Sequence, residues 1–322
     1  MADGKDEMLY LAARRHYVDG ATMETIAQDL GVSRPTVSRL LAKARATGLV
    51  RITLAEPPTA DSPTAKFLRD RFGVRMHMAA LPEPASTGAR FRAVARTAAQ
   101  LLASVVEDGS SLGIAWGTTA VGIAKELQQS PRDDVVVVQM NGAGHARSSA
   151  LPYSGSLLNT YAQAFGDADV IPFPVPAFFD YAATREALWR ERSIRRVREA
   201  ISDLDVALFG IGYPAGKIPS HVYATGYIEA HELAELLRSG VVGDVCTVML
   251  RADGSYADIP INQRASGPNP AEMQGIRRRI GVVGDPSRAT AVLAALRAGT
   301  MTDLVCDPMT ARAVMKLEQP DQ

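Results

Sequence analysis

The first 50 residues repeat apolar side chains at the three- and four-residue intervals of amphipathic helices. They predict one helix over about Glu7–Val18 and two short helices within Met23–Ala42, which together form a compact unit. The apolar stripe of the first helix consists of Leu9, Ala12, Ala13 and Tyr17. The face shared by the other two helices consists of Ile26, Leu30, Val32, Val37 and Leu40, with Ala27 at their closest approach.

The short segment between the second and third helices has the residues of a tight turn. Gly31 can adopt the positive φ that such a turn needs. Ser33 is a good N-cap for the third helix, and Pro35 is tolerated because it falls within the first turn. Thr22 can cap the second helix in the same way. Two short helices joined by such a turn are typical of a helix-turn-helix motif.

The third predicted helix presents a polar, basic outer surface. Residues 31–55 contain five basic residues and no acidic one, although the whole chain balances 35 Lys and Arg against 35 Asp and Glu. A local basic patch is sufficient for phosphate binding, so we expect double-stranded operator DNA as a partner. The alternative is an ordinary helical hairpin with a solvated basic face. The candidate DNA-binding residues are Ser33, Arg34, Pro35, Thr36, Ser38, Arg39 and Lys43.

A change of composition separates this unit from the remainder. Residues 49–54 alternate weakly and predict a short strand. Residues 56–63 contain three prolines, which stiffen the segment and exclude a helix there. We therefore predict a helix-turn-helix domain over residues 1–55, a linker over 56–63 and an effector-binding domain over 64–322.

Beyond the linker, short β-branched runs alternate with longer helical stretches. This alternation is typical of an α/β domain with a largely parallel sheet. The predicted strands are Val74–Ala80, Ser111–Ala115, Asp134–Met140, Ala168–Ile171, Val206–Phe209, Val245–Leu250, Ile280–Val283 and Leu304–Cys306. The predicted helices are Arg90–Val106, Thr119–Gln128, Leu157–Ala164, Ile194–Ile201, His231–Leu237, Pro286–Leu296 and Pro308–Met315.

Composition narrows the function classes. The hydrophobic fraction of 47% and the charged fraction of 22% are ordinary for a globular protein. No apolar run approaches the ~20 residues that span a bilayer, and the first residues lack the apolar core of a signal peptide. The two cysteines and five scattered histidines provide no metal-ligand spacing. We expect a soluble cytoplasmic protein with no membrane partner, no metal and no cofactor.

Four glycine-containing loops follow predicted strands, where open parallel sheets bind ligands. They span residues 113–119, 139–144, 210–212 and 284–288. Gly117 allows close backbone approach, and the neighbouring hydroxyls and amides can hold an anion. Together the loops predict a pocket for a small, anionic, hydroxyl-rich molecule. None matches a Walker loop or a Gly-x-Gly-x-x-Gly fingerprint.

The ordered set of motifs resembles the SorC family of bacterial sugar-responsive transcription regulators. The resemblance rests on the N-terminal unit, the proline-rich linker and four stretches of residues. Those stretches are Trp116-Gly117-Thr118-Thr119, Gln139–Gly144, Gly240–Val245 and Leu304–Pro308. It covers essentially the whole chain. It implies an effector domain related to sugar-phosphate isomerases and aminosugar-phosphate deaminases, a carbohydrate effector, and assembly into dimers or tetramers.

The resemblance also implies roles for individual residues. Thr118, Thr119 and the helix opening near Arg288 would hold a phosphate, whereas Gln139, Asn141 and Asp307 would face the sugar. This chain has Arg288 where family members often have a lysine, and Pro308 replaces the usual acidic residue after the terminal aspartate. The complete set of candidate effector-binding residues is Gly117, Thr118, Thr119, Gln139, Asn141, Gly142, Gly212, Arg288 and Asp307.

Two other functions fit parts of the pattern. A phosphosugar isomerase or deaminase with an appended DNA-binding unit would need a general base, for which Asp307 is a candidate. No second carboxylate or histidine is evident beside it in the loops. A DNA-binding structural protein without a ligand would leave the four glycine loops unexplained. We therefore expect a non-enzymatic, oligomeric transcription regulator of the repressor type, controlled by a sugar, polyol or sugar phosphate.

Overall fold

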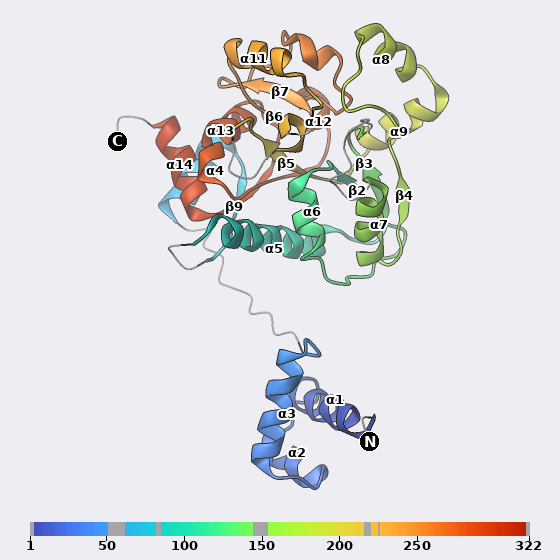
Figure 1. Ribbon diagram of the computed structural model, residues 1–322, viewed down its shortest axis with the longest axis vertical. Coiled ribbons are helices and arrows are strands. Elements are labelled where there is room, and N and C mark those ends of the chain that lie inside the picture. Colours follow the sequence, from blue (N-terminus) through green and yellow to red (C-terminus); the bar gives the residue numbers. More distant parts are fainter. Residues whose placement is uncertain are drawn as a thin grey trace. The chain divides into compact units, whose positions relative to one another are not determined.

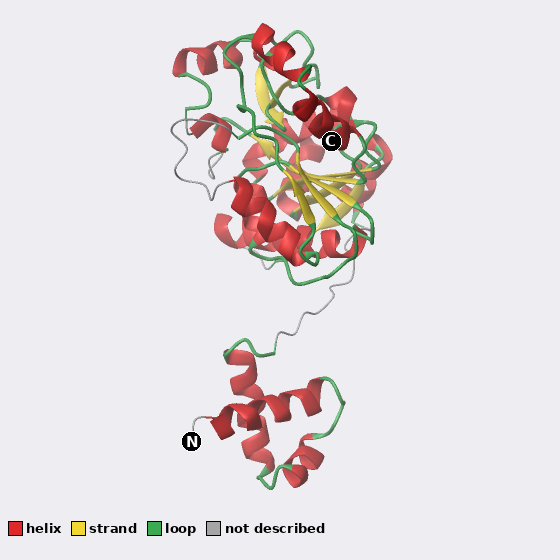
Figure 2. Ribbon diagram, turned by 90° about the vertical axis from the view of Figure 1, so that its right-hand side faces the viewer, coloured by secondary structure: helices red, strands yellow, loops and turns green. Residues whose placement is uncertain are grey.

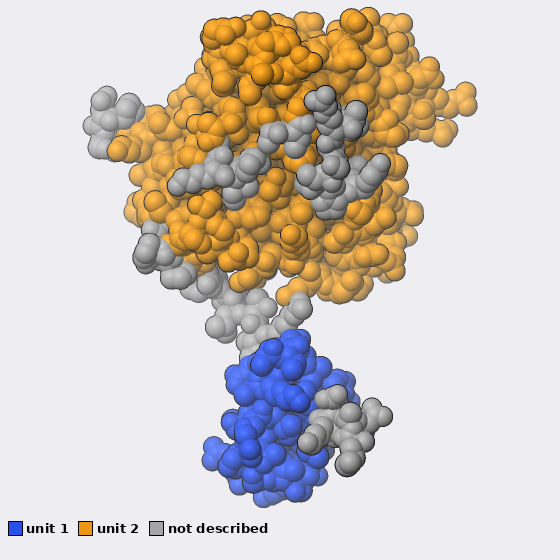
Figure 3. Space-filling model, in the orientation of Figure 1, with its two compact units in different colours: residues 1–57 blue, residues 58–322 orange. Residues whose placement is uncertain are grey.

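Three helices form the first part of the chain: α1 (Asp3–Tyr17), α2 (Met23–Asp29) and α3 (Arg34–Ala46). The computed structural model describes residues 3–50, 62–81, 85–143, 154–215, 220–224 and 226–319. It divides into two units, residues 1–57 and 58–322 (Figure 3). Most of the strand expected at 49–54 and of the linker expected at 56–63 lies outside the described residues, as does Gly144.

The helices of the first unit pack around a small apolar core. Ala12, Ile26, Val37 and Leu41 are buried in it. Gly31 adopts a φ of 63°, and Thr22 and Ser33 cap α2 and α3, in agreement with the sequence. Two side chains differ from expectation. Leu40 packs against this core but is only partly buried, whereas Leu41, one helical turn beyond Val37, is buried within it. Tyr17 at the end of α1 is exposed.

The second unit alternates strands and helices (Figure 1). Its strands are β1 (Arg75–Met78), β2 (Ser111–Ile114), β3 (Val136–Gln139), β4 (Asp169–Ile171), β5 (Val206–Gly212), β6 (Val241–Val245), β7 (Val248–Arg251), β8 (Arg278–Val283) and β9 (Asp303–Cys306). Its α-helices are α4 (Pro63–Phe72), α5 (Thr87–Val105), α6 (Thr118–Ala124), α7 (Ser154–Ala164), α8 (Ala182–Trp189), α9 (Arg192–Ser202), α10 (His221–Ala224), α11 (Ala230–Arg238), α12 (Pro270–Met273), α13 (Ala289–Arg297) and α14 (Pro308–Glu318).

The strands form one sheet with the order β1-β9-β8-β5-β2-β3-β4, and all neighbours along this path are parallel. A hairpin of β6 and β7 extends it, because β6 pairs with β5 in the antiparallel direction. The prediction of an α/β unit with a mostly parallel sheet is therefore confirmed.

Helices cover both faces of the twisted sheet (Figure 2). Alternate side chains of β5 enter different cores: Val206 and Leu208 pack with α5 and α7, whereas Ala207 and Phe209 pack with α9, α13 and α14. This two-sided burial explains why the strands read as continuous apolar runs.

Three local predictions were wrong. The strand expected over Val245–Leu250 is interrupted by a turn, in which Cys246 and Thr247 adopt φ values of 51° and 72°. Residues 210–212 were expected in a loop but extend β5, because Ile211 and Gly212 pair with β6. Pro63 does not exclude a helix, since it lies in the first turn of α4, which Ser62 caps.

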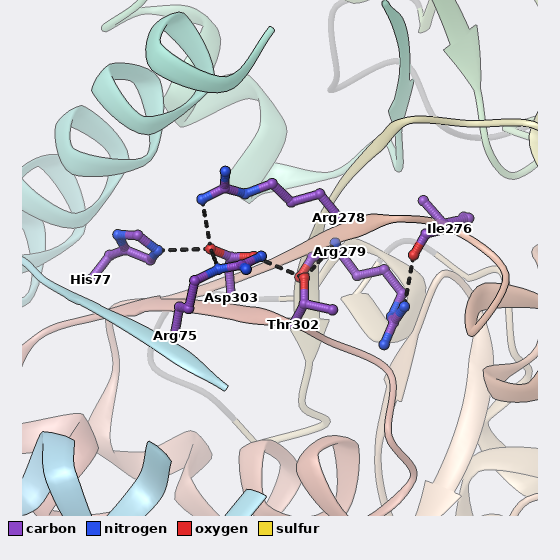
Figure 4. Close-up of polar contacts among 7 residues, drawn as sticks. All are labelled: Arg75, His77, Ile276, Arg278, Arg279, Thr302 and Asp303. Carbon is purple, nitrogen blue, oxygen red and sulfur yellow. Dashed lines mark hydrogen bonds and ion pairs between the residues drawn. The ribbon is translucent and has the colours of Figure 1, made fainter. Parts of the chain in front are cut away.

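The amino ends of three strands meet at a buried carboxylate (Figure 4). The Asp303 side chain is fully buried and accepts hydrogen bonds from Arg75 Nε (3.0 Å) and Nη2 (2.7 Å) and from Arg278 Nη2 (2.9 Å). His77 Nε2 lies 2.8 Å from the same carboxylate, and Thr302 Oγ1 donates to it at 2.8 Å. Asp303 thus ties β1, β8 and β9 together at the edge opposite the strands' carboxyl ends.

Candidate functional site

A cavity of about 760 Å³, partly open to solvent, lies at the carboxyl ends of β2, β5 and β8. β2 leads outward through β3 to β4, whereas its neighbour β5 leads outward through β8 and β9 in the opposite direction. The order of the strands therefore reverses between β2 and β5. Open parallel sheets bind ligands at such a switch point, so the cavity is the candidate site of this unit.

Six of the nine candidate effector residues line this cavity. Residues 117–119 join β2 to α6, and Asn141 follows β3. Gly212 ends β5, and Arg288 closes the short 3-10 helix Pro286–Arg288 after β8. The six are Gly117, Thr118, Thr119, Asn141, Gly212 and Arg288. The structure thus brings together residues from four segments that are far apart in the sequence.

Gln139 and Gly142 lie behind the cavity wall and support the backbone. Gln139 is buried; its Nε2 donates to Asn141 O (2.8 Å), and its Oε1 accepts from Phe173 N (3.1 Å). Gly142 N donates to Ser266 Oγ (2.9 Å), and its carbonyl accepts from Trp116 Nε1 (2.7 Å). A contact of either residue with a sugar stays a prediction.

Asp307 is also absent from the lining. It is fully buried as the N-cap of α14, where it accepts from the amides of Met309 (3.0 Å) and Thr310 (3.2 Å). Arg90 Nη1 of α5 pairs with the same carboxylate at 2.5 Å. This arrangement uses Asp307 to join β9, α14 and α5, and the sugar contact implied by the family resemblance stays a prediction.

Arg288 lines the cavity but is held closely by the protein. Its Nη1 donates to Ile211 O (2.8 Å) and to Ser220 Oγ (3.0 Å), and its Nε lies 3.7 Å from Asp285 Oδ2. Burial lowers the pKa of the guanidinium, while Asp285 and Asp244 act in the opposite direction. A ligand phosphate at Arg288 would therefore share this cation with the chain's own acceptors.

Asp244 of β6 lines the cavity, although it was not among the candidate residues. Burial raises its pKa to about 6, against the opposing effects of Tyr223, Thr247 and Arg288. Its Oδ2 accepts from Thr247 N at 3.2 Å. A Cβ on Gly212 would lie 1.7 Å from Asp244 Oδ1, so the glycine is what permits the carboxylate to lie there. The only signal in the sequence was its place in the stretch Gly240–Val245.

An aromatic surface forms another wall. The Trp116 ring lies edge-on to His221 (5.9 Å between centroids) and tilted against Tyr227 (5.3 Å). Trp116 and His221 both line the cavity. Burial lowers the pKa of His221, which favours the neutral imidazole. Such a wall suits the apolar face of a sugar ring.

Three buried oxygens of lining residues have no hydrogen-bond partner among the described residues: Asn141 Oδ1, Asp244 Oδ1 and Asp285 Oδ2, the last of which lies 3.7 Å from Arg288 Nε. Buried acceptors are almost always satisfied in native proteins, and leaving one unsatisfied costs about 1–3 kcal/mol. The cavity therefore offers acceptors to a ligand that brings hydroxyl donors.

In the first unit, the candidate DNA-binding residues lie at the start and on the outer face of α3. All are exposed except Thr36, which is half-buried. Arg39 Nη2 donates to Thr36 Oγ1 (3.3 Å), and its Nε donates to Pro35 O (3.4 Å). Arg34 Nε lies 3.8 Å from Glu24 Oε2 of α2, with both side chains exposed.

The described residues contain no group of three or more His, Cys, Asp or Glu side chains that could hold a metal ion. Within the same residues, no helix is both long and apolar enough to cross a membrane.

A scan against protein-family models matches residues 56–316 to the family described as “Putative sugar-binding domain”. The deoxyribonucleoside regulator of Bacillus subtilis is 30% identical over 97% of this chain and 98% of its own length. The chain belongs to the SorC family of sugar-responsive transcriptional regulators. This membership agrees with the resemblance in the motifs.

Other SorC-family members give the same result. The sorbitol operon regulator of Klebsiella pneumoniae is 25% identical over 94% of this chain and 96% of its own. The crystal structure of full-length SorC from that organism matches with a TM-score of 0.81 at 23% identity, covering 96% of this chain and 98% of that one. A domain of a “possible sugar-binding transcriptional regulator” from Arthrobacter aurescens TC1 matches with a TM-score of 0.73 at 36% identity, covering 81% and 100%. These relatives are named as regulators.

Proposed function

We propose that this chain binds operator DNA through α2 and α3 and that a sugar, polyol or sugar phosphate in the cavity controls that binding. The observation that carries the effector part is the pair of buried acceptors, Asn141 Oδ1 and Asp244 Oδ1, on a wall shared with Trp116. Hydroxyl groups would satisfy both oxygens, and the aromatic ring would cover the apolar face of the ligand. The family to which the chain belongs supports a carbohydrate ligand.

The DNA-binding part rests on α3. Its exposed face carries Arg34, Ser38, Arg39 and Lys43 and no acidic side chain, while its other face is buried against α1 and α2. A helix of this kind reads base edges in the major groove, and its cations bind phosphates. This proposal includes the assignment of α2 and α3 as a helix-turn-helix motif. It also includes a cytoplasmic location, where the regulator has access to the DNA.

A phosphate group on the effector would lie at Thr118 and Thr119. Both threonines line the cavity where the backbone enters α6, and Gly117 has a φ of 150°. A Cβ on Gly210 would lie 2.6 Å from Thr119 Oγ1, so the glycine of β5 leaves room for this threonine. The relationship of the second unit to sugar-phosphate isomerases is part of the same proposal.

Control of DNA binding requires two states with different effector affinities. We place this chain in a homodimer or tetramer, because two symmetric half-sites are the usual source of specific affinity. The effector would then shift the spacing of the two helix-turn-helix units. No cofactor takes part in this scheme.

The test is a thermal-shift screen of the full chain against paired sugars and sugar phosphates, followed by DNA titration with each compound that stabilises it. At about 100 times its Kd, a cognate effector should stabilise the fold by roughly 2.7 kcal/mol. The operator is first selected from a pool of random duplexes. A panel in which no carbohydrate changes either stability or operator affinity would overturn the effector assignment.

A phosphosugar enzyme is the second candidate, because Asp244 lines the cavity with a pKa raised to about 6 by burial. A carboxyl group with such a pKa can act as a general base near neutral pH. His221 lines the same cavity. Turnover of ribose or glucosamine phosphates that disappears in Asp244→Asn would establish this alternative.

A further inference from the structure

A second cavity, of about 380 Å³ and partly open to solvent, lies between α8, α9 and the segment leading into α12. Two arginines, an indole and one carboxylate supply its polar and aromatic lining: Arg185 and Trp189 of α8, Arg198 of α9 and Glu272 of α12. Phe173 and Pro268 add apolar surface. None of these residues lines the first cavity.

Trp189 is the centre of this lining. The guanidinium carbon of Arg185 lies 5.1 Å from the indole centroid, and that of Arg198 lies 5.4 Å from it. Phe173 and Phe179 contact the same indole at centroid distances of 5.8 and 5.4 Å. Two cations are thus held on one aromatic side chain, with apolar rings behind it.

The carboxylate of Glu272 is already used. Its Oε1 accepts from Arg198 Nη2 (3.1 Å), and its Oε2 accepts from Asn269 N (2.8 Å), which caps α12. Glu272 therefore balances one of the two arginines, Arg198, and cannot serve the other to the same degree.

Arg185 is the cation in excess. Its Nη1 donates to Gln263 O at 3.2 Å, and its Nε is buried without a hydrogen-bond partner among the described residues. Burial lowers the pKa of Arg185, Glu272 raises it, repulsion from Arg198 lowers it again, and Glu186, which lies outside the lining, raises it. The lining carries two arginines and one glutamate, a net charge of +1. A guanidinium has five N–H donors in a planar fork that matches a carboxylate.

We propose that this cavity binds a small monocarboxylate whose apolar body lies against Trp189 and Phe173. A single negative charge balances the lining, whereas a phosphate dianion would exceed it and would leave the aromatic surface uncovered. The site is separate from the first cavity, and residues 266–267 form the wall between them. Ser266 Oγ accepts from Gly142 N (2.9 Å), and a Cβ on Gly267 would lie 1.8 Å from the carbonyl oxygen of Cys246, a residue that lines the first cavity.

The experiment uses benzoate as the probe and the full chain. Its binding is followed by saturation-transfer NMR and by quenching of tryptophan fluorescence, with inorganic phosphate as the competing anion. We expect saturable benzoate binding that Arg185→Gln weakens about tenfold or more, as for loss of a charge-assisted bidentate pair. Arg195→Gln is the matched control, because Arg195 is an exposed arginine of α9 that pairs with Glu199 and lies outside the lining.

A second variant keeps the test valid should Arg185→Gln fold poorly. Ser202 is an exposed residue of the cavity lining, and its hydroxyl donates to the backbone carbonyl of Arg198 (3.0 Å), so Ser202→Tyr should block benzoate while it keeps both guanidinium groups. Thr118→Glu, in the first cavity, should leave benzoate affinity unchanged. The proposal is overturned if benzoate does not bind, if phosphate binds more tightly than benzoate, or if Thr118→Glu abolishes binding while Ser202→Tyr does not. These results do not depend on the sugar effector or on DNA.

Discussion

The buried carboxylate at the amino edge of the sheet gives the most direct test of the fold. Asp303→Asn keeps the shape of the side chain but removes its charge and replaces one acceptor oxygen with an N–H donor. That donor would face the groups that already donate to Asp303, namely Arg75, Arg278 and His77. The variant therefore removes the counter-charge that this fully buried carboxylate supplies to Arg75 and Arg278.

The cost follows from the exposure of the partners. Removing one partner of a buried ion pair typically costs 3–5 kcal/mol. Arg75 is 56% exposed and can turn toward water, whereas Arg278 and His77 are about a quarter exposed and cannot do so freely. The remaining asparagine oxygen also keeps one acceptor. We therefore expect Asp303→Asn to lower the free energy of unfolding by about 2–4 kcal/mol.

Urea unfolding followed by tryptophan fluorescence measures this loss. Both tryptophans, Trp116 and Trp189, belong to residues 58–322, so the signal reports on that unit alone. Glu199→Gln is the control, because it breaks an exposed pair with Arg195 and should cost only about 0–0.5 kcal/mol. An Asp303→Asn midpoint equal to that of the control, with an unchanged m-value, would refute the assignment of Asp303 as the tie between the strands.

The pH dependence has a definite sign. Burial alone would raise the pKa of Asp303, but hydrogen bonds from His77, Arg75, Thr302 and Arg278 together hold it well below its ordinary value. A depressed carboxyl pKa contributes stability above the unfolded value of ~3.9 and loses it as the pH falls below that value. The difference in unfolding free energy between the unmodified protein and Asp303→Asn should therefore narrow as the pH falls below about 4. A difference that widens on acidification would contradict this reasoning.

Three further changes test the proposed function. Arg39→Ala should cost about 1–3 kcal/mol of operator binding if the side chain contacts a base, or should reduce the salt dependence of the operator affinity by about 1 if it binds a phosphate. Operator titrations at two salt concentrations distinguish these outcomes, and unchanged binding at both concentrations would contradict the placement of α3 on the DNA. Thr118→Glu should abolish the melting shift caused by a phosphorylated effector and leave ligand-free operator binding intact, since the charge would repel the phosphate; an unaltered shift would locate the phosphate elsewhere. Asp244→Asn should stabilise the ligand-free protein more at pH 8 than at pH 5, measured against the unmodified protein at the same pH. The raised pKa of Asp244 means that the unmodified protein loses stability as the pH rises through about 6, and the variant lacks this loss. Melting curves at the two pH values would show no such difference if the carboxyl ionises freely.

The elements that the sequence predicted well are those in which local pattern and burial agree. The three helices of the first unit carry both the helical period and the capping residues, and the caps Thr22 and Ser33 were identified from residue type alone. Seven of the eight strands predicted beyond the linker coincide with β1–β5, β8 and β9, because strands buried on both faces are short, continuous β-branched runs. Boundaries shifted by a few residues where a cap or an edge pairing extended the element.

The β6–β7 hairpin could not be predicted from pattern. Its turn residues, Cys246 and Thr247, both adopt positive φ, a conformation that hairpin turns usually give to glycine or asparagine. Without such a residue, the run Val245–Leu250 has the pattern of one uninterrupted strand. The positive φ persists because the surroundings hold the turn, with Thr247 N bonded to Asp244 and the Cys246 carbonyl packed against Gly267.

Asp307 shows how one residue can support two interpretations. An aspartate directly before a proline at the start of a helix is also a capping signal, since the carboxylate accepts the free amides of the first turn. The structure displays this arrangement, with the amides of Met309 and Thr310 both bonded to Asp307. The capping pattern was present in the sequence, whereas the family resemblance predicted a contact between Asp307 and the sugar.

The composition of the first cavity depends on the topology of the sheet. The loops after β2, β3 and β8 could be assigned to one edge because parallel strands share a direction, and that rule needs only the order of elements. Asp244 reaches the same cavity by a different route: β6 returns antiparallel beside the end of β5, and the missing side chain of Gly212 makes room for its carboxylate. His221 enters from α10, outside the repeating strand–helix pattern. The backbone of the site thus follows from rules that the sequence expresses locally. The groups that would distinguish one carbohydrate from another lie on the β6–β7 hairpin and on α10, which are outside the regular strand–helix repeat. For that reason the effector class can be proposed from motifs, whereas the identity of the effector must come from binding experiments.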